Sequence, residues 1–252
     1  MKKTLGVIPA RMASSRFPGK PLKKILGIPM LAHCYERAML SKACDKLVIS
    51  TPDEEIMTWA KNHKIPSILT GHHHQRATER AQETLEILSK QGEIFDCILL
   101  LQGDEPQISP DDIKNLSAAF CGSEFEIVNL VYPVNSNDLA NPNVVKAITS
   151  NTSKISFFSR AYIPHGSNKA MRQLGMIGFT IAALNQYTNL HPTPLEELES
   201  IDMMRLLEND YEINAVISSS PILGVDNPED IEKAERMMTK DLLFKTYQDK
   251  YI

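Results

Sequence analysis

The stretch TLGVIPARMASSRFPGKPL, residues 4–22, joins a continuous apolar run to a polar loop that contains Arg11, Arg16 and Lys20. A short apolar run of this kind is typical of a strand that is buried on both faces of a sheet. Three more runs follow along the chain: DKLVIST (45–51), IPSILTG (65–71) and DCILLLQ (96–102). Segments with apolar residues at helical spacing separate them: 29–43, 53–64 and 77–91. This alternation predicts an α/β fold with a mostly parallel central sheet flanked by helices.

The pattern changes after about residue 125, where residues 126–134, 154–164 and 176–184 are strand-like with loops rather than long helices between them. The change predicts a smaller antiparallel, strand-rich subregion at about 125–200. Ser109 and Asn227 each precede a proline and two acidic residues, which predicts two capped helix starts. Neither a repeat nor a Gly/Ser-rich linker divides the chain, so we expect one domain over residues 1–252.

Composition excludes two classes of function. The net charge of −4 argues against non-specific electrostatic binding to nucleic acid, because such binding needs a broad excess of Lys and Arg. No apolar run approaches the roughly 18 to 20 residues that cross a bilayer, and the first residues do not form a signal peptide, so we expect a cytoplasmic protein. The cysteines show no C-x-x-C spacing and are expected to be reduced thiols: Cys34, Cys44, Cys97 and Cys121.

The loop after the first strand is a candidate phosphate site. It contains neither G-x-G-x-x-G nor a Walker motif, which disfavours a Rossmann dehydrogenase and a P-loop NTPase. Gly19 permits unusual backbone angles, and the cations Arg11, Arg16 and Lys20 can bind phosphate oxygens. Basic side chains that merely solvate a surface turn remain an equally good interpretation of this loop by itself.

Two aspartates are candidate Mg²⁺ ligands. Asp104 follows the apolar run 98–101, and ligands in open α/β sheets bind at the carboxyl ends of the strands. Magnesium is commonly held by one or two carboxylates together with substrate phosphates, so a partner acid is expected. Asp226 lies in ILGVDNPED, at the end of another apolar segment, and fits that role. The alternative is that Asp226 only stabilises the following helix, although Asn227 can already cap it.

Four motifs occur in a fixed order: V-I-P-A-R-x-x-S-x-R-x-P-G-K-P-L, H-Q-x-x-T-E-R, L-Q-G-D-E-P and G-V-D-x-P-E-D. In this order and at these separations they closely resemble the 3-deoxy-manno-octulosonate (KDO) cytidylyltransferases, nearly from end to end. The resemblance implies a nucleotide-diphospho-sugar transferase-like fold. It also implies a homodimeric, Mg²⁺-dependent enzyme that joins CTP to an acidic sugar and releases pyrophosphate. The strand-rich subregion would then serve dimerisation and acceptor binding.

The resemblance also implies roles for individual residues. Candidate catalytic residues are Arg11, Lys20, Asp104 and Asp226, of which the two aspartates would hold the metal. Candidate nucleotide-binding residues are Ala10, Arg11, Arg16, Lys20, Arg76, Ala77, Thr78, Arg80 and Gln102. Candidate acceptor-binding residues are Gln102, Arg160, Gln173, Ile177, Asp202 and Met203. We expect Arg160 to bind the acceptor's carboxylate, because a guanidinium suits a planar acid group.

The sequence departs from the family at both substrates. Arg76 and Ala77 replace the Ser-Gly pair of H-x-S-G-T-E-R, near the base. On the acceptor side, His-Leu-Gly-x-Tyr-Gly-Tyr appears as residues 173–179, QLGMIGF, and Glu-Gln-Leu-Arg appears as 202–205, DMMR. Loss of polar contacts changes which acceptor fits. Our hypothesis is that the acceptor is a related but different acid: a modified ulosonate or another anionic metabolite that carries a hydroxyl nucleophile. The competing hypothesis is a KDO enzyme with a drifted pocket.

Three wider alternatives remain open at this point: another base, a sugar-phosphate acceptor, or a nucleotide-binding module without turnover. The proposed chemistry requires no Ser, Cys or His nucleophile. We therefore interpret His33, His63, His165 and His191 as structural or surface residues. The run at residues 72–74 is interpreted as a polar loop, because adjacent side chains of an extended chain point to opposite faces and rarely bind one ion together.

Overall fold

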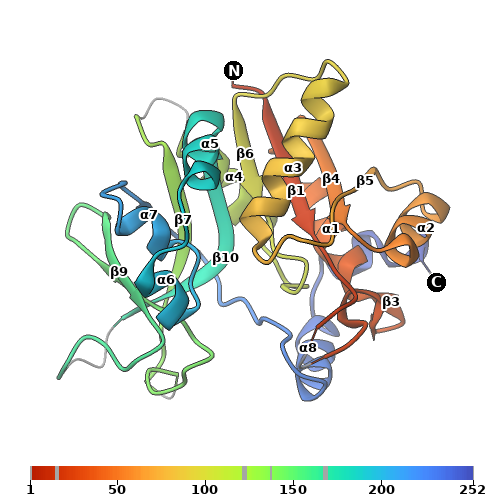
Figure 1. Ribbon diagram of the computed structural model, residues 1–252. Helices are drawn as coiled ribbons and strands as arrows, with labels where there is room; N and C mark the ends of the chain where they lie inside the picture. Colours follow the sequence, from red (N-terminus) through yellow and green to blue (C-terminus); the bar gives the residue numbers. More distant parts are fainter. Residues whose placement is uncertain (1, 15–16, 121–123, 137, 167–169, 252) are drawn as a thin grey trace.

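A computed structural model describes residues 2–14, 17–120, 124–136, 138–166 and 170–251 (Figure 1). One nine-stranded mixed sheet has the order β11-β7-β10-β6-β1-β4-β5, and β8 and β9 extend it from β10. A separate two-stranded sheet is formed by β2 and β3. The predicted fold class, a mostly parallel sheet flanked by helices with a smaller antiparallel part, is confirmed.

The strands divide into two groups at β6. On one side, β5, β4, β1 and β6 pair in parallel; on the other, β10 is antiparallel to β6, β7 and β8, while β11 is parallel to β7. The strand bounds are β1 Thr4–Pro9, β2 Lys24–Ile25, β3 Ile28–Pro29, β4 Lys46–Thr51, β5 Ser67–Leu69, β6 Cys97–Leu100, β7 Ile127–Pro133, β8 Lys146–Thr149, β9 Ile155–Ser159, β10 Met171–Thr180 and β11 Asn214–Ile217.

Helices cover both faces of the sheet. Their bounds are α1 Met30–Ser41, α2 Glu54–Asn62, α3 Ala77–Lys90, α4 Pro110–Ala118, α5 Ile181–Asn189, α6 Pro194–Glu199, α7 Met204–Leu207 and α8 Glu229–Met238, with 3₁₀ turns η1 Lys20–Leu22, η2 Phe244–Thr246 and η3 Gln248–Lys250. Helices α3 and α5 share one core with the sheet, whereas α1, α2 and α4 share the other (Figure 1).

The central strands are buried on both sides, as continuous apolar runs require. Along β1, Leu5 and Val7 face the core shared with α3, and Ile8 faces the core shared with α1. Along β6, Ile98 faces the first core and Leu99 the second. This two-residue alternation follows from the pleat of a strand, and it decides which of the two cores each side chain of the strand faces.

Three predicted boundaries had different outcomes. Helix α4 begins as predicted, because the Ser109 hydroxyl accepts a hydrogen bond from the Asp112 amide (3.4 Å). The strand expected over 176–184 ends at Thr180, whose hydroxyl accepts a hydrogen bond from the Ala183 amide and starts α5. The predicted Asn227 cap of α8 is wrong. The carboxylate of Asp230 instead accepts hydrogen bonds from the amides of residues 226 and 227.

Within the described ranges, no helix combines the length and apolar character that a bilayer span requires. Three of the cysteines lie in those ranges, and each is a free thiol: Cys34, Cys44 and Cys97. Burial, together with the charge of Asp45, raises the pKa of Cys44 to about 12. Cys121 lies outside the described residues.

Candidate active site

A cavity of about 300 Å³ opens at the carboxyl ends of β1 and β6. Strand order reverses at β1, which has β4 on one side and β6 on the other, and such a switch point leaves a crevice between the following loops. The cavity is lined by Pro9, Ala10, Arg11, Ala13, Ser14, Lys20, Pro21, His74, Gln75, Arg76, Ala77, Arg80, Gln102, Gly103, Asp104 and Asp226. Segments far apart in the sequence therefore meet at one site.

Lys20 lies between the two predicted metal ligands. Its Nζ is 2.7 Å from Asp104 Oδ2 and 3.7 Å from Asp226 Oδ1. The same ammonium group donates a 2.8 Å hydrogen bond to the Val225 carbonyl. Gly19, at φ 72°, adopts the left-handed conformation that starts η1 and aims Lys20 into the cavity. The structure thus brings together the cation and both carboxylates that the sequence singled out.

Backbone hydrogen bonds fix the two aspartates beside each other. The Val225 amide donates to the Asp104 carbonyl (2.9 Å), which joins the loop after β6 to the segment before α8. Asp230 then fixes Asp226 and its neighbour by accepting from their amides at 3.1 and 3.0 Å. These contacts fix the backbone at both aspartates.

The loop after β1 presents Arg11 at the cavity wall. The Ala10 amide donates to the Ser50 carbonyl (2.9 Å), and the Met12 amide donates to Asp53 Oδ2 (2.7 Å). These two bonds hold the backbone on either side of Arg11, whose side chain is exposed. Asp53 is a site residue that the sequence analysis missed, since it reads as an ordinary helix cap. Arg16 lies outside the described residues.

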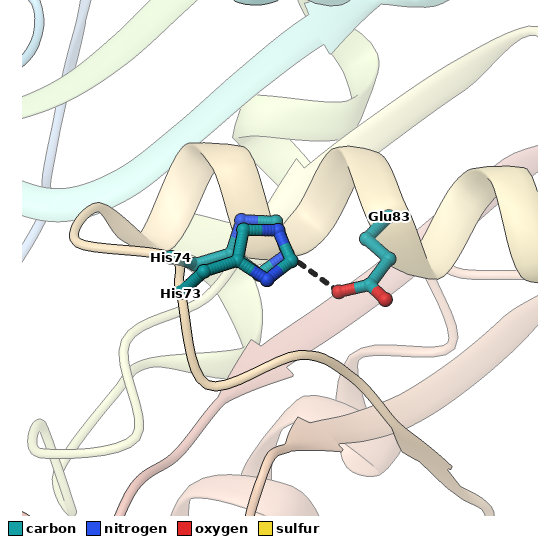
Figure 2. A group of neighbouring side chains, drawn as sticks. All are labelled: His73, His74 and Glu83. Atoms are coloured by element: carbon teal, nitrogen blue, oxygen red, sulfur yellow. Dashed lines mark hydrogen bonds and ion pairs between the residues drawn. The ribbon is translucent and has the colours of Figure 1, made fainter.

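Another wall of the cavity is the segment that leads into α3, residues 74–77. His74 lines the cavity and hydrogen-bonds to Glu83 of α3, and a ring nitrogen of the adjacent His73 lies within 4.8 Å of the Glu83 carboxylate (Figure 2). Residues 72 and 73 form a turn, so the extended-chain premise applied to the histidine run does not hold there. His33, in contrast, is buried and hydrogen-bonded to Tyr247 and to the Ile25 carbonyl, as expected of a structural residue.

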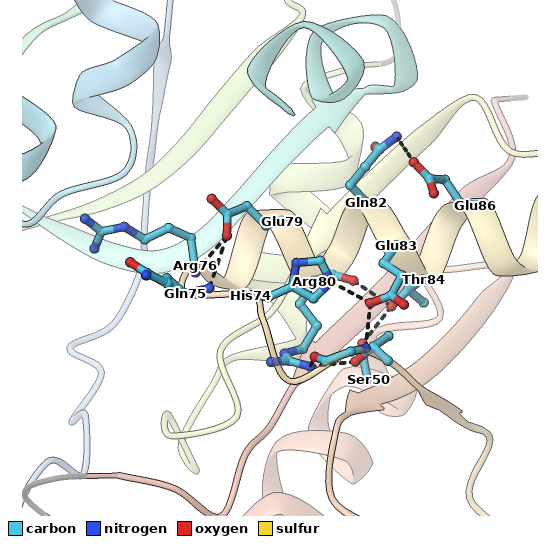
Figure 3. A network of polar contacts seen from close by, with 12 residues as sticks. Ser50, His74, Gln75, Arg76, Glu79, Arg80, Gln82, Glu83, Thr84 and Glu86 are labelled. Carbon is cyan, nitrogen blue, oxygen red and sulfur yellow. Dashed lines mark hydrogen bonds and ion pairs between the residues drawn. The ribbon is translucent and has the colours of Figure 1, made fainter. Parts of the chain in front are cut away.

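Polar contacts position the predicted nucleotide residues on α3 (Figure 3). The Arg76 amide donates to Glu79 Oε2 (3.2 Å), and Arg80 Nη1 donates to Thr70 Oγ1 (2.6 Å). Arg76, Ala77 and Arg80 line the cavity. Thr78 is fully buried and donates to Asp202 Oδ2 (2.9 Å), so its side chain joins α3 to the segment before α7 instead of lining the cavity.

Among the predicted acceptor residues, the structure brings only Gln102 to the described cavity lining. The Arg160 guanidinium donates to the carbonyls of residues 142, 199 and 200. Gln173 donates to Asn129 Oδ1 (2.7 Å), and Ile177 and Met203 are buried in the core. Burial raises the pKa of Asp202, which accepts from Thr78. These side chains already have partners inside the protein.

Glu105 and Gly175 form a support behind Gln102 that the sequence analysis missed. Glu105 is buried, and its Oε1 accepts a 3.0 Å hydrogen bond from the Gly175 amide. Burial and the adjacent charge of Asp104 raise the pKa of Glu105 to about 7. A Cβ at Gly175 would overlap Gln102 Cγ, so glycine lets strand β10 pass directly behind Gln102. The motif L-Q-G-D-E-P contains Glu105, but its sequence does not indicate that the Glu105 side chain is buried.

Comparisons with known proteins identify the family of the chain. Residues 5–214 match the family described as Cytidylyltransferase. The mitochondrial 3-deoxy-manno-octulosonate cytidylyltransferase of Arabidopsis thaliana is 36% identical over 244 residues, covering 94% of this chain and 83% of that protein. An 8-amino-3,8-dideoxy-manno-octulosonate cytidylyltransferase of Shewanella sp. (strain W3-18-1) is 36% identical over 239 residues, covering 92% and 97%.

A solved structure shares the fold over almost the whole chain. The CMP:2-keto-3-deoxy-manno-octonic acid synthetase complexed with CTP superimposes with a TM-score of 0.87 at 29% identity, covering 95% of this chain and 100% of that one. With the family match over residues 5–214, these similarities confirm the resemblance read from the motifs, and the chain is a nucleotidyltransferase that belongs to the cytidylyltransferase family.

Proposed function

We propose that this enzyme joins CTP to an acidic sugar of the 3-deoxy-ulosonate class, giving a CMP-sugar and pyrophosphate in a Mg²⁺-dependent reaction. The observation that carries the proposal is the position of Lys20 between Asp104 and Asp226 in a cavity that Arg11 also lines. Cations that suit a triphosphate and carboxylates that suit a divalent ion line the same cavity. The names of the relatives supply the base and the class of acid.

The donor set at the aspartates fits magnesium. Both are carboxylates, and their side chains are 34% and 37% exposed, so phosphate and water oxygens have room to complete an octahedral shell. When bound there, Mg²⁺ would neutralise phosphate charge. Asp104 and Asp226 are the residues that would hold it. Lys20 keeps the two acids together and reaches the same part of the cavity.

The chain's own groups suit an in-line displacement at the α-phosphorus. The acceptor hydroxyl forms the new P–O bond and loses its proton, while the bond to the departing pyrophosphate breaks. Arg11 and Lys20 are placed to bind phosphate oxygens and to stabilise the negative charge that develops on them. Preorganised charges of this kind act mainly through positioning and electrostatics. Gln102, supported by Gly175, is the amide placed to orient the acceptor.

A screen of acceptors tests the proposal. The purified protein is incubated with CTP, Mg²⁺ and one acid at a time: KDO, its 8-amino-8-deoxy analogue, other ulosonates and simple hydroxy acids. Mass spectrometry of the cytidine product identifies the acid that turns over fastest. Fastest turnover of an ulosonate supports the proposal, and the ratio of KDO to its rivals decides whether the pocket has changed specificity. Absence of pyrophosphate release with every ulosonate would contradict it.

Base preference needs a separate measurement, because Arg76 and Ala77 depart from the family at the base-proximal motif. Thermal shifts are compared for CTP, UTP, GTP and ATP at equal concentration, since a ligand raises stability according to its occupancy. We expect the largest shift with CTP. A larger shift with another nucleotide would overturn the choice of cytosine but leave the reaction class intact.

We also propose a homodimer that uses the strand-rich subregion. An apolar groove there is lined by Pro133, Val134, Ala147, Ile148, Thr149, Pro164, Ala170 and Met171. Covering such a groove with a second copy removes apolar surface from water. Light scattering on the eluted peak of a size-exclusion column should give a mass near twice 28.3 kDa. Introducing a charge with Met171→Glu should shift the mass to that of one chain.

A further inference from the structure

Two adjacent histidines and one glutamate converge outside the aspartate pair. The turn at residues 72 and 73 places the rings of His73 and His74 4.0 Å apart, measured between centroids. Figure 2 shows both imidazoles on the same side of the loop, next to Glu83 of α3. His74 Nε2 lies 2.5 Å from Glu83 Oε2, and one potential ligand atom from each residue lies within 4.8 Å of the other two.

The backbone around this group is arranged to hold it. The Gly71 amide donates a 2.8 Å hydrogen bond to Glu83 Oε2, which fixes the carboxylate against the loop. A Cβ at Gly71 would overlap the His73 ring, so glycine makes room for that imidazole. Partial burial acts to raise the pKa of Glu83. The Gly71 amide and the His74 imidazole outweigh it, and the net pKa is lowered.

We propose that His73, His74 and Glu83 bind a borderline divalent transition-metal ion such as Zn²⁺, at a site separate from Asp104 and Asp226. Two imidazole nitrogens and one carboxylate oxygen are a common zinc ligand set, with water in the fourth position. Magnesium prefers oxygen ligands only, so the two sites select different ions.

Small side-chain movements convert the present arrangement into a coordination shell. Metal–ligand distances of about 2.1 Å in a tetrahedron place ligand atoms about 3.4 Å apart. His73 is exposed and free of burial constraints, so its ring can swing inward, while His74 and Glu83 separate slightly to admit the ion. The ion takes the place of the hydrogen bond between His74 and Glu83. Because His74 also lines the nucleotide cavity, a bound ion fixes the segment that enters α3.

Isothermal titration with ZnCl₂ tests the site on metal-stripped protein that carries no polyhistidine tag, in excess Mg²⁺ so that the aspartate pair is occupied. We expect wild type to bind one Zn²⁺ per chain, and His73→Ala and Glu83→Gln to weaken binding at least tenfold. His72→Ala is the matched control, since His72 is an exposed neighbour outside the group, and it should bind like wild type. Equal weakening by His72→Ala and His73→Ala would overturn the proposal, as would wild-type binding no tighter than that of His73→Ala.

A second pair of measurements separates this site from the aspartates and from misfolding. Asp226→Asn should leave Zn²⁺ binding unchanged; loss of binding there would assign the ion to Asp104 and Asp226 and refute the site. Each variant is also melted with and without ZnCl₂, because a ligand stabilises only the fold that binds it. We expect the variants of His73 and Glu83 to melt like wild type without zinc and to lose the zinc-induced rise. Glu83→Gln keeps an oxygen that can accept from the Gly71 amide.

Discussion

Lys20 donates a 2.7 Å hydrogen bond to Asp104 across a sequence separation of 84 residues. The bond joins the loop after β1 to the loop after β6, two neighbouring parallel strands. Both loops leave the same edge of the sheet, so the contact follows from topology as much as from charge. It also means that the cation and the carboxylate are in place before any substrate arrives, which is how a site avoids reorganisation during the reaction.

Replacing Lys20 tests whether this preorganised cation stabilises the transition state. Lys20→Ala should lower kcat/KM for CTP by roughly 10²-fold to 10³-fold, the loss typical of one preorganised donor. Steady-state pyrophosphate release at saturating acceptor measures it. Lys24→Ala is the control, because Lys24 is a nearby exposed lysine outside the cavity lining. Equal rates for Lys20→Ala and wild type would remove Lys20 from the proposed mechanism.

Asp226→Asn tests the proposed metal ligand without changing its size. We expect turnover to fall at least 10²-fold and the Mg²⁺ concentration for half-maximal rate to rise, because an amide is a weaker magnesium ligand than a carboxylate. Rates are measured over a Mg²⁺ titration, and circular dichroism checks the fold. Glu232→Gln is the control, an exposed acid of α8 outside the cavity. An unchanged Mg²⁺ titration for Asp226→Asn would rule out its role as a ligand.

Gly175→Ala tests the contact that supports Gln102. The added methyl group overlaps Gln102 Cγ, so the glutamine side chain must move within the cavity wall. We expect KM for the acceptor to rise roughly tenfold, about 1.4 kcal/mol, while KM for CTP changes little. Gly224→Ala is a matched control, since a Cβ there meets no atom within 4 Å. A parallel rise in both KM values would indicate general distortion rather than loss of an acceptor contact.

The parts of the fold and site that could be predicted share one property: they are encoded locally. The apolar runs at β1, β4 and β6 are continuous because both faces of a central strand are buried. Lys20 and Asp104 were identifiable because each lies in the loop that follows such a run, and strand ends in a parallel sheet meet at one edge. The pairing of Asp104 with Asp226 was also expected, and the Val225 hydrogen bond provides its geometry.

The remaining features depend on a local turn or on contacts between distant segments, which the sequence by itself does not reveal. Arg160 looks like a carboxylate receptor in the sequence, but backbone carbonyls of other segments take up its guanidinium. Glu105 looks like an exposed acid and is buried against Gly175. An extended chain would point the side chains of His73 and His74 to opposite faces, but the turn at residues 72 and 73 brings their rings together. In each case tertiary packing decides which groups a polar side chain meets.

Arg205→Met tests a buried ion pair that packs α6 against α7. Arg205 and Glu196 are 4% and 1% exposed and share two hydrogen bonds of 2.7 and 2.8 Å. Removing the Arg205 cation leaves the buried Glu196 carboxylate with Arg76, whose Nε lies 3.4 Å from Glu196 Oε1, as its remaining cationic partner. We therefore expect the free energy of unfolding to fall by about 3 kcal/mol, the lower end of the range for breaking a buried ion pair. Urea denaturation measures the change. Arg236→Met breaks an exposed pair with Glu232 and should cost less than ~1 kcal/mol. Similar losses in both variants would contradict the distinction between buried and exposed pairs.

His33 predicts how stability depends on pH. Burial, aided by the charge of Arg37, lowers the pKa of His33 to about 4, below the 6.5 of an unfolded histidine. The Ile25 carbonyl can only accept, so Nε2 carries the proton and Nδ1 accepts from the Tyr247 hydroxyl, which satisfies the neutral ring. Between these pKa values the unfolded chain binds the extra proton. The contribution of His33 is therefore present above pH 6.5 and is lost as the pH falls toward 4, on the order of 3 kcal/mol in all.

His33→Gln removes this titration while keeping groups that can hydrogen-bond to Tyr247 and Ile25. Urea unfolding is measured at intervals from pH 8 to pH 4 for wild type and the variant. Carboxylate titrations common to both proteins cancel in the difference, so the wild-type free energy of unfolding should fall more steeply below pH 6.5 than that of the variant. His191→Asn, at an exposed histidine, should follow wild type. Parallel curves for wild type and His33→Gln would show that the His33 pKa in the folded protein is not lowered, because a group that titrates alike in both states leaves no slope.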